Sequence, residues 1–116
     1  MKIIRIKEVS VEERGGYSIK RLCTEELLKN PQNLGFYETT ITFGSNCPSH
    51  SHENLDEFII FLTKGKMDIN QKKYWFEPGD IVVLRPGDKH EFIADENKIK
   101  LIAIKAPNIP KDKIVF

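Results

Sequence analysis

Residues 57–84 read EFIIFLTKGKMDINQKKYWFEPGDIVVL, and this stretch decides the fold. It holds short runs of aromatic and β-branched residues, separated by the turn-forming pairs Lys64–Gly65, Gln71–Lys72 and Pro78–Gly79. Runs of this length between such turns predict a meander of short antiparallel strands. The first run, Glu57–Leu62, is apolar on both faces, which indicates a strand that is covered on both sides.

The β pattern continues outward in both directions. Further strands are predicted over Met1–Val11, Tyr17–Cys23, Phe36–Phe43, Ile81–Leu84, His90–Ala94 and Ile99–Ile104. The tail that contains Pro107 and Pro110 is expected to be a coil that wraps the outside. About eight or nine short strands with almost no helix indicate an all-β fold, either a barrel or a double-sheet jelly roll.

One short N-terminal helix is expected ahead of the barrel. Thr24 can cap it, Glu25 and Glu26 lie in its positive first turn, and Pro31 stops it after Lys29. No second helix is predicted anywhere in the sequence.

A single domain accounts for the whole chain, because 116 residues and 13.4 kDa are close to the commonest domain size. Its expected parts are N-terminal strands over 1–35, core motifs over 36–94, and a C-terminal strand and tail over 95–116. The net charge is +1, from 18 basic and 17 acidic residues, so no electrostatic attraction to nucleic acid is expected.

The protein is expected to be cytoplasmic. Its longest wholly apolar run, Phe58–Leu62, is far shorter than the roughly 20 residues that cross a membrane. Charged residues from Lys2 to Glu8 interrupt any signal-peptide core. In a reducing cytosol, Cys23 and Cys47 are expected to be free thiols.

All three histidines of the chain fall between positions 50 and 90. On a strand, His50 and His52 face the same side, so both imidazoles point into one space while Ser51 points away. A short turn can bring the Glu57 carboxylate back beside them, and His90 follows a Gly/Pro turn. Three imidazoles and one carboxylate suit one divalent transition metal per chain, such as Mn, Fe, Ni or Zn, and are poor ligands for Ca or Mg.

Two segments resemble the signature motifs of the cupin family. Residues 44–57 read GSNCPSHSHENLDE and are similar to the first motif, G-x5-H-x-H-x(3,4)-E-x6-G. Residues 79–90 read GDIVVLRPGDKH and are similar to the second motif, G-x5-P-x-G-x2-H-x3-N. The resemblance, which covers about half of the chain, implies a cupin-type double-stranded β-helix. It also implies that the family's four metal-ligand positions are here His50, His52, Glu57 and His90.

Three positions depart from these motifs. Seven residues separate Glu57 from Gly65 where the first motif has six, which predicts a turn that is one residue longer. Pro86 and Gly87 are adjacent, but the second motif keeps its total length, so the ligands are expected to stay in register. Ala94 replaces the final asparagine, which weakens any transfer of detailed substrate chemistry.

Three functions are compatible with such a site, since four protein ligands leave two positions open on an octahedral metal. The first is a small metalloenzyme that carries out an Fe- or Mn-dependent reaction of dioxygenase type on a small organic substrate. The second is non-catalytic, metal-dependent binding of a small carboxylate or sugar. The third is a metal-assisted isomerase or epimerase, which would need a general base, and no inward histidine is left over for that role.

Strand alternation also predicts the surroundings of the site. The residues expected to point inward are Ile59, Phe61, Phe92 and Ala94. The candidates for polar contacts with a substrate are Arg21, Tyr37, Thr39 and Arg85, with Trp75 as an aromatic wall. Phe58, Ile60 and Leu62 point outward and are all apolar, so something must cover them. The Met1–Val11 strand is expected to do so, either within the chain or from a neighbour, and the resemblance to strand-sharing cupin dimers implies a homodimer.

Overall fold

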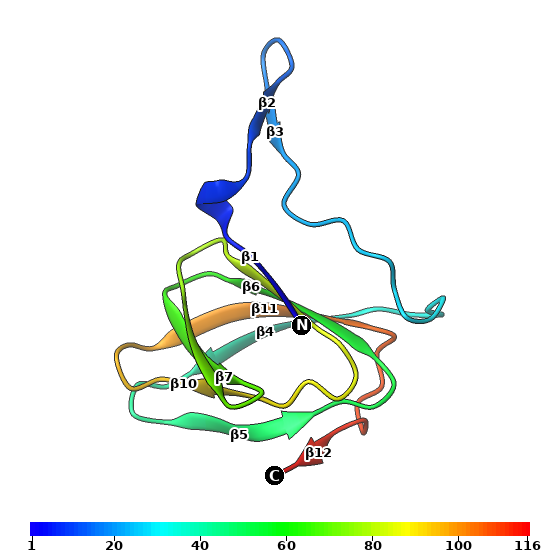
Figure 1. Ribbon diagram of the computed structural model, residues 1–116, viewed down its shortest axis with the longest axis vertical. Helices are drawn as coiled ribbons and strands as arrows, with labels where there is room; N and C mark the ends of the chain where they lie inside the picture. The colour runs from blue at the N-terminus through cyan, green and yellow to red at the C-terminus, as the bar shows by residue number, and fades with distance from the viewer.

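The computed structural model describes residues 1–116, except for the side chain of Asn46, and confirms the all-β fold (Figure 1). The strands are β1 (Lys2–Ile4), β2 (Val11–Glu13), β3 (Ser18–Lys20), β4 (Gly35–Ile41), β5 (Asn46–Ser51), β6 (Asp56–Phe61), β7 (Gly65–Ile69), β8 (Lys72–Phe76), β9 (Ile81–Leu84), β10 (His90–Ile93), β11 (Ile99–Ala106) and β12 (Ile114–Val115). The one helical element in the described chain is a 3-10 turn, η1 (Ile6–Glu8).

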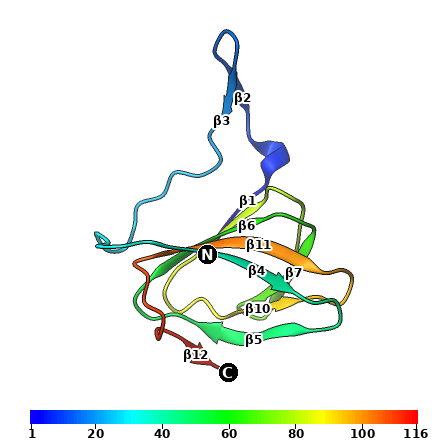
Figure 2. The same ribbon diagram turned by 180° about the vertical axis from the view of Figure 1, so that it is seen from behind.

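Two five-stranded antiparallel sheets form the barrel, one in the order β1-β9-β6-β11-β4 and the other in the order β12-β5-β10-β7-β8. From β4 to β7, successive strands alternate between the two sheets, which is the arrangement of a double-stranded β-helix. The sheets lie one above the other in both views (Figures 1 and 2), and β2 and β3 form a separate hairpin that projects away from them.

The predicted meander is confirmed at one turn and is wrong at the turn before it. β7 and β8 pair through Asn70–Gln71, whose φ angles of 52° and 71° are those of a tight two-residue hairpin turn. β6 and β7, in contrast, lie in different sheets, because both edges of β6 are already paired with β9 and β11. The Lys64–Gly65 turn therefore carries the chain across the barrel.

Side chains at alternate positions fill the space between the two sheets. The four residues predicted to point inward are all buried: Ile59, Phe61, Phe92 and Ala94. The rings of Phe61 and Phe76 stack with their centroids 4.3 Å apart, and burial of each ring contributes about 2 kcal/mol. A Cβ at Gly65 would overlap the Phe61 ring, so this glycine lets the chain cross closely above the core.

The short helix predicted over residues 24–29 is wrong, because this segment is irregular coil with a bend at Leu28 and Lys29. Its backbone groups bond to the barrel instead of to each other. The amide of Leu28 donates to Asp56 Oδ2 at 2.7 Å, and Arg85 Nη1 donates to the carbonyl of Glu26 at 3.0 Å. A helix of one or two turns is marginal in water, so these tertiary bonds override its capping signals.

The single strand predicted over Met1–Val11 is divided into β1, η1 and β2. Asp80, which is buried, causes the break: its carboxylate accepts the amide of Ile6 at 2.9 Å and Arg5 Nη1 at 3.0 Å. These bonds turn the chain away from the sheet after β1. Residues 5–34, called here the N-terminal arm, then pass through the projecting hairpin before β4 begins (Figure 2).

The C-terminal tail wraps the barrel as predicted, and it also adds a strand. β12 pairs with β5 through Ile114 opposite Ser51 and Val115 opposite His50. The tail therefore lies against the strand that carries the histidine pair. No helix among residues 1–116 has the length and apolar character to span a bilayer.

Candidate metal centre

The four predicted ligands come together from three strands, across both sheets. His50 lies on β5 and His52 directly after it, so both rings project to the same side of the strand. Glu57 is near the start of β6, and His90 opens β10, where its Cα is the direct partner of His50. The i, i+2 spacing and the strand pairing thus explain the cluster.

The turn before His90 links the two motifs. Gly87, with a φ of 88°, adopts a left-handed conformation that favours glycine, and its amide donates to the carbonyl of His52 at 2.9 Å. Asp88 closes the turn by accepting the amide of Arg85 at 2.8 Å. The adjacent Pro86–Gly87 pair therefore leaves the ligand register intact.

Each histidine ring is held by a backbone carbonyl on its Nδ1 side. His50 Nδ1 donates to the carbonyl of Pro48 at 2.8 Å, and His52 Nδ1 donates to that of Asp112 at 2.5 Å. His90 makes the same kind of bond, at 2.9 Å, within the turn that precedes it. A neutral imidazole that donates from Nδ1 has its lone pair on Nε2, so all three rings offer Nε2 as the ligand atom.

The free ligand atoms converge. One ring nitrogen of each histidine lies within 4.8 Å of the other two, and Glu57 Oε1 is 3.3 Å from Nε2 of both His52 and His90. All four side chains are buried, with exposed fractions between 1% and 6%. His52 Nε2, His90 Nε2 and Glu57 Oε1 have no hydrogen-bond partner among the described atoms. Buried acceptors without donors are costly, and a cation between them would satisfy all of them, so the residues fit a metal ion.

The surroundings shift the pKa values of three ligands. Burial lowers the pKa of His50 to about 4, which keeps the ring neutral. Burial also acts on His52, but the neighbouring Glu57 carboxylate and the bond to the Asp112 carbonyl outweigh it and raise the pKa of this ring. For Glu57, burial is outweighed by the neighbouring rings of His52 and His90, which favour the carboxylate when they are protonated and hold the pKa of this carboxyl well below the usual range. The carboxylate is therefore in the form that binds a metal.

A cavity of about 240 Å³ opens beside the ligands, which is room for about eight water molecules. Its lining residues are Tyr37, Thr39, Cys47, His50, Glu57, Phe92, Leu101, Ala103, Lys105 and Lys113. Tyr37 and Thr39 are thus at the site as predicted. Cys47 is a free thiol, as is Cys23, and burial raises its pKa, so it is protonated at neutral pH.

The other three polar or aromatic candidates lie elsewhere. Arg21 is on the N-terminal arm, where it pairs with Glu12 at 3.1 Å. Arg85 binds Asp56 Oδ1 at 3.2 Å and holds the arm against the barrel. Trp75 is 54% exposed on β8. The path of the N-terminal arm decides the position of Arg21, whereas alternation along β8 turns Trp75 outward between Tyr74 and Phe76.

Three polar residues of the site had no role in the sequence prediction: Lys105, Asp112 and Lys113. Lys105 could have been found, since it continues the inward series Leu101, Ala103 on β11. Asp112 and Lys113 could not, because nothing in the tail's sequence indicates that it pairs with β5 beside the histidines.

The fold and the site together define a small double-stranded β-helix protein with a candidate metal centre inside the barrel. The sequence matches the Cupin domain family over residues 37–105, more than half of the chain, and the protein therefore belongs to the cupin family. The search of curated proteins finds no match.

Solved structures agree on the fold. A protein with a double-stranded β-helix domain from Klebsiella pneumoniae is 15% identical, with a TM-score of 0.66, over 99% of this chain and 96% of that one. A cupin-2 domain containing protein from Shewanella frigidimarina is 17% identical, with a TM-score of 0.57, over 70% of this chain and 78% of that one. The DMSP lyase DddQ from Ruegeria pomeroyi is 16% identical, with a TM-score of 0.64, over 72% of this chain but only 43% of the lyase.

Proposed function

We propose that the protein is a mononuclear metalloenzyme that binds one divalent transition metal through His50, His52, Glu57 and His90 and carries out a reaction of dioxygenase type on a small organic substrate. The observation that supports this best is the set of buried, unpaired Nε2 and Oε1 atoms beside an accessible cavity. A structural metal site would be closed by its protein ligands, whereas a catalytic site keeps room for a substrate.

A bound Fe or Mn ion would supply Lewis-acid and redox chemistry at this place. The chain's own contribution is to hold the ligands and shape the cavity. The Nδ1 bonds fix the three ring orientations before any metal binds, and Glu57 supplies the one negative charge. Phe92 and Leu101 exclude water from the inner wall, while the hydroxyl group of Thr39 is available to orient a polar substrate. The Tyr37 hydroxyl donates to Asn108 Oδ1 at 2.5 Å and can still accept a hydrogen bond.

Non-catalytic, metal-dependent binding of a small carboxylate or sugar is the second candidate. It would use the same ligands, and the small volume of the cavity, below the range of drug-sized pockets, favours a small ligand in either case. A metal-assisted isomerase or epimerase ranks below both, because every histidine of the chain is one of the proposed ligands. The likeness to a lyase extends to the fold alone.

One experiment separates the first two candidates. Protein depleted of metal is reloaded anaerobically with Fe, Mn, Ni or Zn, its metal content is measured, and oxygen consumption is followed with a panel of small organic acids. We expect about one metal per chain and substrate-dependent oxygen uptake with Fe or Mn only. Stoichiometric metal without oxygen uptake for any acid that binds would favour the binding protein. Failure of all four metals to bind would reject both.

We also propose that the protein works as a homodimer in the cytoplasm. The apolar outer face of the sheet that contains β6 supports the dimer. Cell fractionation tests the location, and recovery of the protein in the membrane fraction would contradict it.

A further inference from the structure

We propose that the substrate carries a second anionic group and that Lys105 and Lys113, which line the cavity beside the metal ligands, bind it. This inference rests on the proposed function, because it assumes that one end of the substrate approaches the metal. It concerns the substrate class, which neither the fold nor the family fixes.

Lys105 reaches the cavity because of strand alternation. Leu101, Ala103 and Lys105 face inward along β11, and all three line the cavity. The Cα of Lys105 is the direct partner of Glu57 on β6, so the lysine stands beside a proposed metal ligand. Its Nζ lies 5.3 Å from the centroid of the Tyr37 ring, at the same wall.

Lys113 reaches the same cavity from the C-terminal tail, which is firmly attached there. Asp112 accepts the amides of Glu53 and Asn54 at 2.9 and 2.7 Å, and β12 follows at once. Lys113 thus faces the cavity from the side of β5, whereas Lys105 faces it from β11. One ammonium group thus comes from strand β11 and the other from the coil directly before β12.

Neither lysine has an acidic partner. Within the described chain no ion pair involves Lys105 or Lys113, although Lys100 of the same strand β11 pairs with Glu38 at 3.3 Å. Both ammonium groups act on the Cys47 thiol, where each favours the thiolate, so their positive field extends into the cavity. The only carboxylate among the lining residues is Glu57, which the metal would engage.

This charge arrangement selects the substrate. A divalent metal, one carboxylate and two lysines leave the loaded cavity strongly positive, which attracts an anion. Lys105 is half-buried and Lys113 is exposed, so a substrate that chelates the metal through one carboxylate would gain charge-assisted bonds to these lysines only if its far end were also negative. Lysine donates three hydrogen bonds to either a carboxylate or a phosphate, so the shared requirement is an anionic far end.

The test uses three hydroxy acids that share the chelating group and differ at the far end. Zn-loaded protein, which is redox-inert, is titrated calorimetrically with L-lactate, L-malate and 3-phosphoglycerate. We expect L-malate or 3-phosphoglycerate, or both, to bind at least about tenfold more tightly than L-lactate. Whichever of L-malate and 3-phosphoglycerate binds more tightly shows whether the far group is a carboxylate or a phosphate.

Matched lysine variants assign the effect. Lys105→Met and Lys113→Met should each lose about tenfold for the dianionic probe and leave L-lactate binding unchanged. The controls Lys100→Met, on the outer side of β11, and Lys111→Met, exposed in the tail, should bind like the wild type. Lys105→Gln replaces Lys105→Met if the latter does not fold by circular dichroism.

Two results would overturn the inference without touching the proposed function. The first is equal affinity of the metal-loaded protein for L-lactate, L-malate and 3-phosphoglycerate. The second is an affinity for L-malate or 3-phosphoglycerate that is the same in the two lysine variants as in their controls. The lysine-dependent binding could also be equally strong in metal-free protein. This result would support the anion site at the two lysines and contradict its link to a metal-bound substrate. Failure of the wild-type protein to take up Zn would instead count against the proposed function.

Discussion

At the residue scale, the site is organised by bonds that the ligands make on the side away from the cavity. Backbone carbonyls accept Nδ1–H from all three histidines, which selects one tautomer and one ring orientation for each. Because main-chain carbonyls hold the rings, their orientation depends on the strands, turns and tail that carry these carbonyls. The ligand set should therefore tolerate changes at neighbouring side chains that do not fix these segments.

A comparison of His52→Ala with Ser51→Ala tests whether the metal depends on the proposed ligand and not on its neighbour. The first removes an Nε2 ligand, and the second removes a hydroxyl on the opposite face of β5. We expect His52→Ala to lose the metal and Ser51→Ala to keep it near one per chain by elemental analysis. With free metal at about 100 times its Kd, the loss should lower the free energy of unfolding by about 2.7 kcal/mol, which also lowers the melting temperature.

His50→Ala, Glu57→Ala and His90→Ala should behave like His52→Ala. Glu53→Ala is a second control, since Glu53 is exposed. Asp56 is a poor control, because its buried carboxylate binds the N-terminal arm. Wild-type metal content in His52→Ala, or equal loss in Ser51→Ala, would disprove the assignment of these four ligands.

Metal occupancy should depend on pH through His52. Its pKa is raised in the metal-free protein, so a proton must leave Nε2 before a metal can bind, and as pH falls the loss of metal should begin above the ordinary histidine value of about 6.5. His50, with its pKa lowered to about 4, stays neutral over this range and adds little competition. Dialysis against limiting Zn between pH 8 and pH 4, followed by elemental analysis, measures the curve. Flat occupancy down to about pH 4 would argue against a site with three histidines.

The lowered pKa of His50 makes the stability of the metal-free protein depend on pH. The pKa of His50 is lower in the folded state than in the unfolded chain, so the unfolded chain takes up the proton first as pH falls. The contribution of His50 to the free energy of unfolding is therefore complete above about pH 6.5. It is lost as the pH falls toward about 4.

At the scale of elements, the barrel strands and the four-residue cluster could be predicted, whereas the two chain ends could not. Alternation fixes which side chains of β6 and β10 enter the core, and the spacing of the histidines fixes a shared face. The 24–29 segment shows why local sequence patterns fail at the N-terminal end. Its capping signals are local, but its conformation is decided by Asp56 and Arg85, which lie far along the sequence.

The tail shows the same limit from the other end. Its prolines predict a coil, yet residues 112–115 are held against β5 by main-chain pairing and by the Asp112 carboxylate. Main-chain pairing has little sequence signature in so short a strand. Sequence patterns thus predicted the cluster of candidate ligands but missed one of the carbonyls that orient them.

Asp112→Ala tests the role of the tail in the metal site. The change removes the carboxylate that binds the amides of Glu53 and Asn54, so the tail should loosen and the carbonyl that holds His52 should become less well placed. We expect metal affinity to fall by about tenfold, measured by competition with a coloured chelator. The control Lys111→Ala changes an exposed neighbour. Equal affinities in the two variants would show that the tail does not orient His52.

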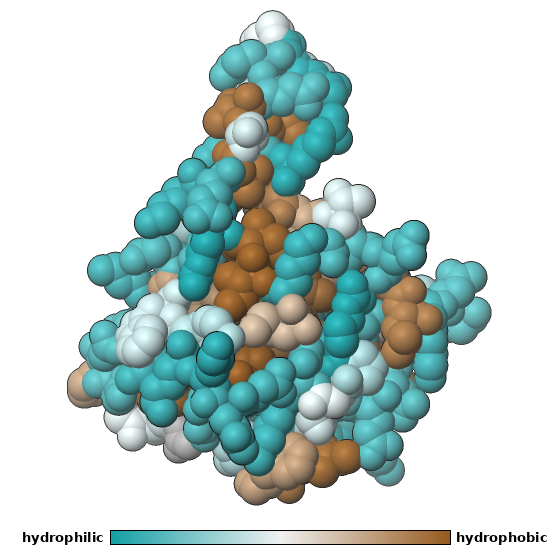
Figure 3. All heavy atoms as spheres, viewed as in Figure 1, coloured by the Kyte–Doolittle hydropathy of each residue, from teal (hydrophilic) through white to brown (hydrophobic). Residues whose placement is uncertain are grey.

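At the scale of the whole molecule, the N-terminal arm is the unusual feature. Its hairpin projects from the barrel (Figure 1), and an isolated two-stranded hairpin is at best marginally stable in water. Val11 and Tyr17 on this hairpin are 51% and 61% exposed. Below it, apolar surface reaches the outside of the barrel (Figure 3). In a symmetric dimer, a second copy of the chain can cover both the projecting arm and the apolar surface beside it.

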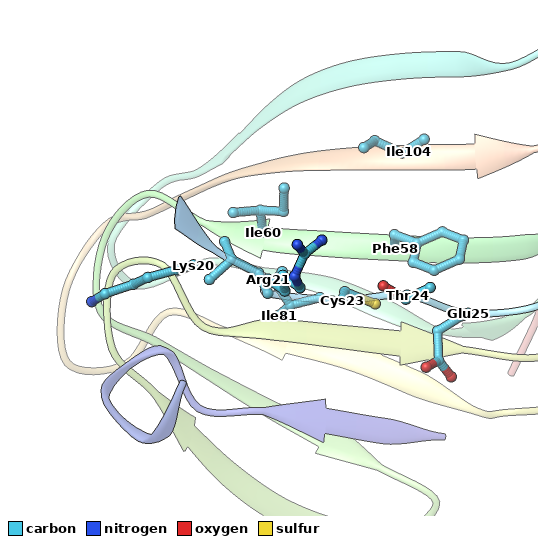
Figure 4. A pocket seen from close by; sticks show the side chains of 10 residues that line it. Lys20, Arg21, Cys23, Thr24, Glu25, Phe58, Ile60, Ile81 and Ile104 are labelled. Atoms are coloured by element: carbon cyan, nitrogen blue, oxygen red, sulfur yellow. The ribbon is translucent and has the colours of Figure 1, made fainter. Parts of the chain in front are cut away.

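The groove between the arm and the sheet is lined on one side by apolar residues of the outer face. Phe58 and Ile60 of β6, Ile81 of β9 and Ile104 of β11 form this wall, and arm residues 20–25 form the other (Figure 4). The groove encloses about 690 Å³ and remains open to solvent. The arm therefore covers only part of the outward residues that the sequence analysis singled out.

We expect the protein to be a dimer with a mass twice 13.4 kDa by light scattering at micromolar concentration. Phe58→Glu places a charge on the outer face and should yield monomers, because an unpaired carboxylate in an apolar interface is costly to bury. Phe43→Glu is the matched control, since Phe43 is 62% exposed outside the groove and should leave the dimer intact. Circular dichroism confirms that both variants fold. A wild-type protein found only at 13.4 kDa would disprove the dimer, and a dimeric Phe58→Glu would place its interface on another face.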